Sequence, residues 1–327
     1  MILHVHSLSG DISCCLNKRP ANSEVRVSFI MKHLFVIAFA LVTVCSGALG
    51  QPQCGVSTGD ANYVLRGDDA APFEFPWQIS IQNPDYLQYS GKWVPNCGGS
   101  IIDKNWILTA AHCVETQPGD DPKIRVVIGA HDITRYGELV SVQELVRTRD
   151  IWIHPMYDTE RIEYDVALIQ LPTPLDFAGK HSHIAPICMP MANESKVFED
   201  MDCMVTGWGR TVNSENKDYN SKILQKLPVH VSRQAECMRA WSDTINGVYR
   251  ITPRHICAAT TRGEGSGVCY GDSGGPLQCY RNGRWVLVGV ADFVRYCGAS
   301  YTPNVFARVT ASLDWIEAVR AARTRVV

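Results

Sequence analysis

The sequence lacks an excess of charge of either sign. Its 327 residues include 33 acidic and 31 basic side chains, which gives a formal net charge of −2 and a pI of about 6.5. A protein that binds nucleic acid neutralises phosphates with a basic excess or a basic stripe. The charge balance therefore argues against nucleic acid as a partner.

A hydrophobic run long enough to span a membrane is also missing. The apolar segment Leu34 to Val44, broken only by Thr43, is shorter than the roughly 20 residues that a spanning helix needs. It follows the basic Met31-Lys32-His33 and precedes the small residues Ala48-Leu49-Gly50, which is typical of a secretory signal peptide and its cleavage site. We expect a signal peptide over residues 31–50 and no membrane association of the mature protein.

Thirty residues precede this segment, and we interpret residues 1–30 as an upstream extension that does not fold. The alternative is that the apolar segment is a signal anchor.

Cys-x-x-Cys pairs are absent from residues 51–327, so a zinc site or a thioredoxin-like site is not indicated. The sequence has thirteen cysteines, of which Cys14, Cys15 and Cys45 precede residue 51. The ten that follow are an even number and can form five disulfides in an oxidising compartment. The cysteine count therefore favours a secreted protein.

What the sequence has in abundance is short runs of β-branched and aromatic residues separated by Gly, Asn and Asp. Such runs are typical of an all-β barrel or sandwich. Asn282-Gly283 predicts a hairpin turn, and apolar residues at helical spacing predict a carboxy-terminal amphipathic helix over 312–323. The expected strands are 77–81, 101–108, 124–128, 166–171, 285–290 and 304–309.

Three separated motifs carry side chains with catalytic chemistry: Thr109-Ala110-Ala111-His112-Cys113, Tyr164-Asp165-Val166-Ala167-Leu168 and Gly271-Asp272-Ser273-Gly274-Gly275-Pro276. In the order His, Asp, Ser, they resemble the chymotrypsin-like serine peptidases. The resemblance runs from Cys54 to the end of the chain. It also includes Phe75-Pro76-Trp77-Gln78, Asn96-Cys97-Gly98-Gly99-Ser100 and Thr206-Gly207-Trp208-Gly209.

The resemblance implies two antiparallel six-stranded β-barrels with the active site between them, and a carboxy-terminal α-helix. It implies that His112 is the general base, that Ser273 is the nucleophile and that Asp165 orients His112. The backbone N–H groups of Gly271 and Ser273 would form the oxyanion hole. The expected partners are protein and peptide substrates, an activating protease and protein inhibitors, and we expect a monomer. A catalytically weakened binding relative, or a structural disulfide-stapled module, is the alternative.

The same resemblance implies how the cysteines pair and which segment is a propeptide. Residues 51–63 would be a propeptide that a disulfide keeps attached to the peptidase domain, residues 64–327. The implied pairs are Cys54–Cys188, Cys97–Cys113, Cys203–Cys279, Cys237–Cys257 and Cys269–Cys297.

Activation in the family frees a β-branched amino terminus whose ammonium pairs with the Asp before the nucleophile, here Asp272. By position this terminus is Val64, and the residue before it is Tyr63 where Arg or Lys is usual. We therefore expect cleavage after Tyr63 by a chymotrypsin-like activator. A cut after Arg66 would leave a terminus too short to reach Asp272.

The specificity pocket implied by the resemblance has no carboxylate at its floor, which disfavours Arg or Lys at the substrate position before the scissile bond, P1. The bulky Val294 favours small or medium aliphatic P1 residues, as in the pancreatic elastases. Large apolar P1 residues are the alternative, because Gly267 leaves the floor open. The implied substrate-binding residues are Gly267, Val268, Tyr270, Asp292, Phe293, Val294 and Asn304, with Ile162 and Trp241 at neighbouring subsites or in ordinary apolar packing.

Asp292 departs from the family, which has at this position a Ser that hydrogen-bonds the catalytic Asp. Two readings follow: a neutral Asp292 donates to Asp165, or Asp292 turns towards solvent. The family's calcium loop begins with a Glu that is Ala130 here, so we expect weak calcium binding or none, and no cofactor. Asn193-Glu194-Ser195 is a candidate glycosylation site.

Overall fold

The computed structural model describes residues 53–57, 68–84, 92–115, 123–137, 140–145, 150–210, 220–242, 250–260, 267–297 and 302–324. The expected upstream extension and signal peptide lie outside the described residues, as do Tyr63 and Val64. Of the expected propeptide, only residues 53–57 are described. None of the described helices is both long and apolar enough to cross a membrane.

The first half of the described chain forms an antiparallel sheet of seven strands in the order β6-β5-β2-β3-β4-β8-β7. Six strands were expected, and the three-residue β7 is among the shortest of the seven. The strands are β2 (Gln78–Pro84), β3 (Trp93–Ile101), β4 (Trp106–Thr109), β5 (Ile124–Ile128), β6 (Ser141–Leu145), β7 (Ile151–Ile153) and β8 (Ala167–Gln170).

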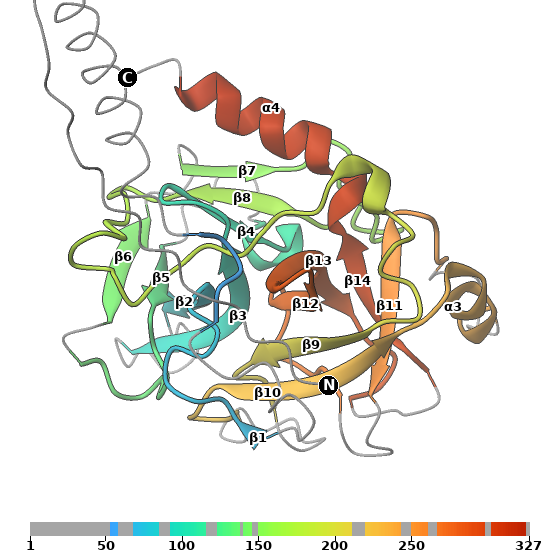
Figure 1. The fold of residues 1–327 in the computed structure, drawn as a ribbon, viewed down its shortest axis with the longest axis horizontal. Helices are drawn as coiled ribbons and strands as arrows, with labels where there is room; N and C mark the ends of the chain where they lie inside the picture. Colours follow the sequence, from blue (N-terminus) through green and yellow to red (C-terminus); the bar gives the residue numbers. More distant parts are fainter. Residues whose placement is uncertain are drawn as a thin grey trace, which may run out of the picture. The chain divides into compact units, whose positions relative to one another are not determined.

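The second half forms a closed barrel, because β10 pairs with both β9 and β11 in the order β10-β11-β14-β13-β12-β9. The two-residue β1 adds to the outer edge of β10. These strands are β1 (Asp68–Asp69), β9 (Asp202–Gly207), β10 (Gln225–Val231), β11 (His255–Thr260), β12 (Pro276–Arg281), β13 (Arg284–Phe293) and β14 (Asn304–Arg308). Figure 1 shows the two sheets side by side, as the expected all-β fold requires.

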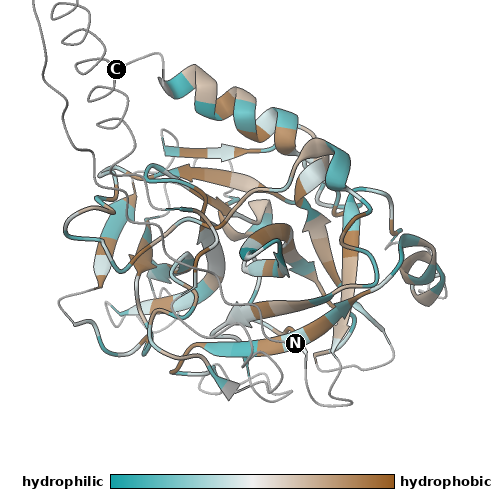
Figure 2. Cartoon of the chain, viewed as in Figure 1, coloured by the Kyte–Doolittle hydropathy of each residue, from teal (hydrophilic) through white to brown (hydrophobic). Residues whose placement is uncertain are grey.

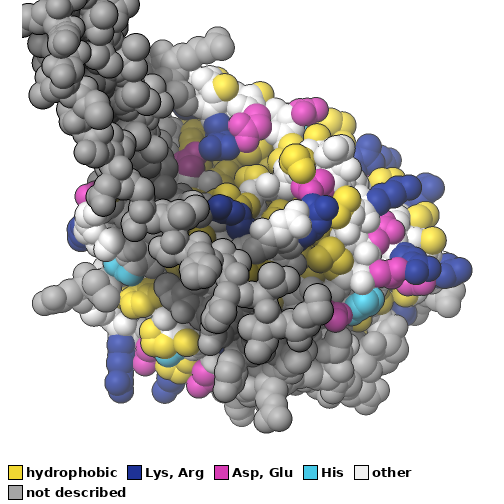
Figure 3. Space-filling view, in the orientation of Figure 1, with side chains coloured by type: hydrophobic (Ala, Val, Ile, Leu, Met, Phe, Trp, Pro, Cys, Tyr) yellow, Lys and Arg dark blue, Asp and Glu magenta, His cyan; other side chains and the backbone are white. Residues whose placement is uncertain are grey.

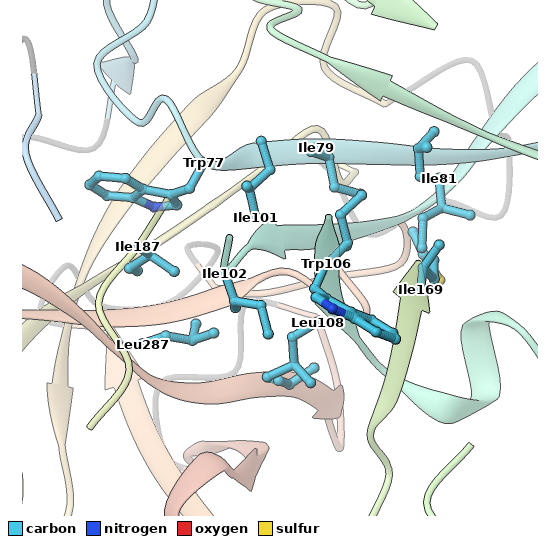
Figure 4. Close-up of a cluster of buried hydrophobic side chains, with 14 of the residues drawn as sticks. Trp77, Ile79, Ile81, Ile101, Ile102, Trp106, Leu108, Ile169, Ile187 and Leu287 are labelled. Atoms are coloured by element: carbon cyan, nitrogen blue, oxygen red, sulfur yellow. The ribbon is translucent and has the colours of Figure 1, made fainter. Parts of the chain in front are cut away.

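The two sheets share a core. Figure 4 shows Leu287 of β13 beside Ile102 and Ile187, in the same buried cluster as Trp77, Ile79 and Ile101. Buried polar side chains also cross between the halves: Trp77 Nε1 donates to Gln278 Oε1 at 2.5 Å. Thr206 Oγ1 likewise donates to Gln78 Oε1 at 2.6 Å. Since buried polar groups are costly when unpaired, these bonds fix how the halves meet.

The hairpin and the terminal helix form where the sequence predicts them. Asn282 and Gly283 join β12 to β13 with φ of 52° and 81°, as a type I′ turn requires. Helix α4 (Leu313–Thr324) buries Ile316, while Arg320 Nη2 donates to Asp103 Oδ2 at 2.5 Å. Figure 2 shows the mixed hydrophilic and hydrophobic residues along this helix.

Two local expectations were wrong. The run expected as one strand over 101–108 is broken by a turn, in which Asp103 Oδ1 accepts from Asn105 N at 2.6 Å and ends the extended backbone. The short helix α3 (Gln234–Ala240) was not expected, and Cys237 anchors it through a disulfide to Cys257 of β11.

On the face shown in Figure 3, basic and acidic side chains of the described residues are interspersed.

Candidate active site

His112 and Asp165 meet because their strands are neighbours. β4 and β8 pair antiparallel with Thr109 opposite Ala167, so the residues after Thr109 and those before Ala167 leave the sheet at the same end. His112 lies in the single turn η2 (Ala111–Cys113). Its Nδ1 lies 2.5 Å from Asp165 Oδ2, and its backbone N–H donates to Asp165 Oδ1 at 2.9 Å.

The electrostatics of this pair favour its charged form. Burial by itself would lower the pKa of His112, but the hydrogen bond and the negative charge of Asp165 outweigh it and raise that pKa above 6.5. Burial would raise the pKa of Asp165, yet its bonds to His112 bring the pKa below 3.8. Asp165 is therefore ionised at neutral pH and accepts the Nδ1 proton.

The loop that carries Ser273 packs against the segment leading to His112. A Cβ at Gly274, whose φ is +76°, would lie 2.3 Å from Thr109 Oγ1 and 2.7 Å from Gly98 O. Gly98 N in turn donates to Ser273 O at 2.7 Å. Only glycine permits this approach at position 274, and it brings the Ser273 loop of the second barrel to the edge of the first sheet that carries His112 and Asp165.

Two backbone N–H groups of this loop have no acceptor among the residues that the structure describes. Asp272, Gly274 and Gly275 donate to backbone carbonyls at 3.0, 2.8 and 2.9 Å, whereas Gly271 N and Ser273 N have no acceptor among the described residues. Gly271 has a φ of +97°, which favours glycine and turns the peptide of the loop. Unpaired N–H groups beside a serine are the elements of an oxyanion hole.

Asp272 is buried under the same loop. Its carboxylate accepts from Gly209 N at 2.8 Å and from Cys269 N at 3.0 Å. It forms no ion pair with another described residue. Burial raises the pKa of Asp272 to about 6, more than these two bonds lower it. A buried carboxylate without a cation is a group that a cation would stabilise.

Asp292 lies beside the His112–Asp165 pair. It is the bulged residue of β13, where the register against β14 shifts between Ala291 and Phe293. Its side chain is buried. One carboxyl oxygen of Asp292, one carboxyl oxygen of Asp165 and one ring nitrogen of His112 lie within 4.8 Å of one another. Burial, followed by the charge of Asp165, raises the pKa of Asp292 well above 3.8. Asp292 therefore does not turn towards solvent.

Four of the residues expected in the pocket belong to two apolar clusters. Trp241 and Phe293 stack edge to face at 5.2 Å in one cluster, while Val268 and Val294 belong to the other. Trp241 is 3 % exposed, so it contributes a buried wall at most. The other expected residues are Gly267, partly buried, Asn304, buried, and Tyr270, which is exposed and faces the Arg210 guanidinium at 4.9 Å.

His255 supports Ile162 and was not expected at the site from the sequence. The Nε2 of His255 lies 2.9 Å from Ile162 O, and its Nδ1 accepts from Thr252 N at 3.0 Å, which assigns the proton to Nε2. Ile162 has a φ of 51°, unfavourable for a β-branched residue, and this hydrogen bond helps to hold it there. No sequence motif marks His255, because its partner Ile162 lies 93 residues away in the sequence.

The disulfides are Cys54–Cys188, Cys97–Cys113, Cys203–Cys279, Cys237–Cys257 and Cys269–Cys297. Cys97–Cys113 fastens the turn that holds His112 to β3, and Cys269–Cys297 joins the segment of Val268 to the segment of Val294. Ala130 is buried, and Asn193 is exposed in the single turn η3 (Ala192–Glu194).

Comparison with known proteins agrees with this geometry. The model of the Trypsin family matches residues 64–316. The chain is 34 % identical to Serine protease 28 of Mus musculus over 258 residues, which cover 77 % of this chain and 87 % of that protein. It is 35 % identical to ovochymase of Halocynthia roretzi over 273 residues, 81 % of this chain but only 16 % of ovochymase. The chain therefore belongs to the trypsin family and is a serine-type endopeptidase.

Proposed function

We propose that this endopeptidase uses His112 as the general base, Ser273 as the nucleophile and Asp165 to orient the base. The observation that carries the proposal is the double contact of Asp165 with His112, through the ring and through the backbone N–H. This contact fixes both the position and the tautomer of the imidazole, and it leaves Nε2 as the basic atom.

In the proposed reaction, Ser273 Oγ attacks the peptide carbonyl carbon while His112 Nε2 takes the hydroxyl proton. The imidazolium then gives that proton to the leaving amine, and water hydrolyses the acyl-enzyme by the same route. The free N–H groups of Gly271 and Ser273 would bind the oxyanion, and each such donor contributes roughly 3 kcal/mol to the transition state. The imidazolium would be stabilised by the ionised Asp165.

For substrate choice, the proposal is small or medium aliphatic residues at P1. Val268 and Val294 pack in one apolar cluster, and the floor position is Gly267, so an Arg or Lys side chain would lose its hydration without gaining a carboxylate. Large apolar P1 residues are the second candidate, favoured by the missing side chain at Gly267.

We also propose that the chain is secreted as a zymogen and activated by cleavage after Tyr63. Asp272 supports this, because a buried carboxylate whose donors are two backbone N–H groups offers a place for the Val64 ammonium. Five disulfides support an oxidising compartment. The mature enzyme is proposed to be a monomer that protein inhibitors can block, with Asn193 as a glycosylation site on an exposed turn.

The test uses recombinant protein whose amino terminus is verified as Val64, with a Ser273→Ala variant as control. A fluorophosphonate probe is expected to label the first and not the second. Peptide amides with Ala, Val, Leu, Phe or Arg at P1 then give kcat/KM values. Highest values for Ala, Val or Leu support the proposed specificity, and highest values for Phe support the second candidate. Absence of both labelling and turnover would overturn the catalytic proposal.

A further inference from the structure

The buried side chain of Asp292 is in an environment that is unfavourable for a negatively charged carboxylate. Both carboxyl oxygens are buried, and neither has a hydrogen-bond donor among the described residues. A buried carboxylate with no donor and no cation is among the least favourable states of a side chain. Asp292 must therefore either carry a proton or be stabilised by a hydrogen-bond donor or a cation.

Among the described residues, no cationic side chain forms an ion pair with Asp292. Asp165 faces it from the segment before β8, and His112 faces it from η2. The negative charge of Asp292 also acts on Tyr157. Burial, followed by the charges of Asp165, Glu115 and Asp292, raises the pKa of Tyr157, so its hydroxyl stays neutral. The proton of His112 Nδ1 is already held by Asp165. A second negative charge at Asp292 would therefore repel Asp165 at short range.

We propose that Asp292 carries a proton and donates a hydrogen bond from it to Asp165, so that the two carboxyl groups share one proton and one negative charge. Asp292 is then a positioning residue of the catalytic triad. The β-bulge of β13 is what aims its side chain at Asp165. The inference rests on the catalytic roles proposed above for His112, Asp165 and Ser273.

Such a pair works only while its proton is bound. When Asp292 is neutral, Asp165 has donors from the His112 ring, the His112 backbone and Asp292, and the imidazole is held in place. When Asp292 ionises, that donor is lost and the two carboxylates repel each other. The raised pKa of Asp292 agrees with the neutral form at neutral pH. Activity is therefore expected to fall at alkaline pH because of Asp292.

The kinetic test compares Asp292→Asn, whose amide donates but cannot ionise, with Asp292→Ala, which cannot donate. We expect Asp292→Asn to keep kcat at pH 7 within about threefold. Asp292→Ala is expected to lower kcat about tenfold or more, with little change in KM, because it removes a hydrogen bond to a charged group. Asp292→Ser, which restores a hydroxyl donor, is expected to recover most of that loss.

The pH profile separates positioning from mere packing. The alkaline fall of kcat/KM in the unchanged enzyme is expected to be reduced in Asp292→Asn. Loss of the Val64 ammonium proton also contributes to this fall, but it affects both enzymes equally. The exposed Asp202→Asn serves as the matched control and is expected to leave the profile unchanged. Superimposable profiles for Asp292→Asn and the unchanged enzyme would overturn the inference.

A second measurement does not need activity. Infrared difference spectra of Ser273→Ala, with and without Asp292→Asn, are recorded at neutral pH before and after treatment with a chelator. A protonated carboxyl band that Asp292→Asn removes supports the inference. Its absence overturns the inference, and a band that appears only after chelator treatment shows that a metal ion had replaced the proton. If the unchanged enzyme is inactive, the proposed function fails while this measurement still decides the state of Asp292.

Discussion

The carboxyl groups of Asp165 and Asp292 lie side by side in the interior, next to His112. A carboxyl oxygen of Asp165 is no more than 4.8 Å from a carboxyl oxygen of Asp292. One of them has its pKa lowered and the other has its pKa raised. Because the pKa shifts of the two carboxyl groups are opposite, their roles differ: Asp165 carries the negative charge and Asp292 carries the proton.

This division predicts a pH dependence of stability. Asp292 keeps its proton in the folded chain but loses it above pH 3.8 in the unfolded chain, so the folded chain binds more protons and stability falls as pH rises from 3.8 towards the raised pKa. The loss is about 1.4 kcal/mol for each pH unit in this window. In a Ser273→Ala background, Asp292→Asn should flatten the dependence of Tm on pH there. An unchanged slope would contradict the raised pKa.

The acid limb of the activity profile is expected to report His112. The base must be neutral to accept the Ser273 proton, and its pKa is raised above 6.5 because Asp165 outweighs the effect of burial. The kcat/KM of the enzyme should therefore fall with an apparent pKa above 6.5 as pH decreases. In Asp165→Asn the limb should shift to lower pH and kcat should fall by about 10⁴-fold. An acid limb that Asp165→Asn leaves in place would show that another group titrates.

Val294 is expected to control the size of the P1 residue. Replacing it by Gly removes an apolar side chain that packs against the cluster containing Val268, and the proposed pocket gains room for an aromatic ring. The ratio of kcat/KM for Phe over Ala at P1 should rise about tenfold or more, as hydrophobic pockets discriminate on that scale. Val294→Ala should give an intermediate ratio. Val197→Ala, on the exposed surface, should leave the ratio as it is.

Asp272 is expected to depend on a free Val64 amino group. The arriving ammonium would pair with the buried carboxylate and bring the pKa of Asp272 below its present value of about 6. Protein cleaved after Tyr63 should therefore be active, and acetylation of its amino terminus should abolish most of the activity. Protein that begins at Gly67 should be as inactive as the uncleaved chain. Full activity of the acetylated enzyme would overturn this mode of activation.

The buried ion pair of Lys226 and Glu74 is expected to matter for stability and not for chemistry. Lys226 Nζ lies 2.7 and 2.9 Å from the two carboxylate oxygens of Glu74, and both side chains are buried. Lys226→Met leaves the Glu74 charge uncompensated and should lower the free energy of unfolding by about 3 to 5 kcal/mol in denaturant titrations. Arg161→Gln, which removes an exposed pair with Asp158, should change it by less than about 1 kcal/mol. Equal effects of the two substitutions would contradict the burial argument.

The sequence by itself determined the family, the all-β architecture and the residues that form the His112–Asp165 pair. It could do so because strand alternation, the Asn282-Gly283 turn and the three motifs are local patterns with a fixed chemistry. It also marked Asp292 as unusual. Residues 101–108 were misjudged because the three polar residues Asp103-Lys104-Asn105 inside the run form a turn that was not recognised.

Only the tertiary structure decided between the two orientations of Asp292, because the direction of its side chain depends on a β-bulge whose register against β14 involves residues far along the chain. The same holds for His255, whose Nε2 partner Ile162 lies 93 residues away in the sequence. It holds also for the buried contacts of Trp77 with Gln278 and of Gln78 with Thr206. Local sequence sets what a residue can do, whereas burial and long-range neighbours set its charge state and the direction in which it acts.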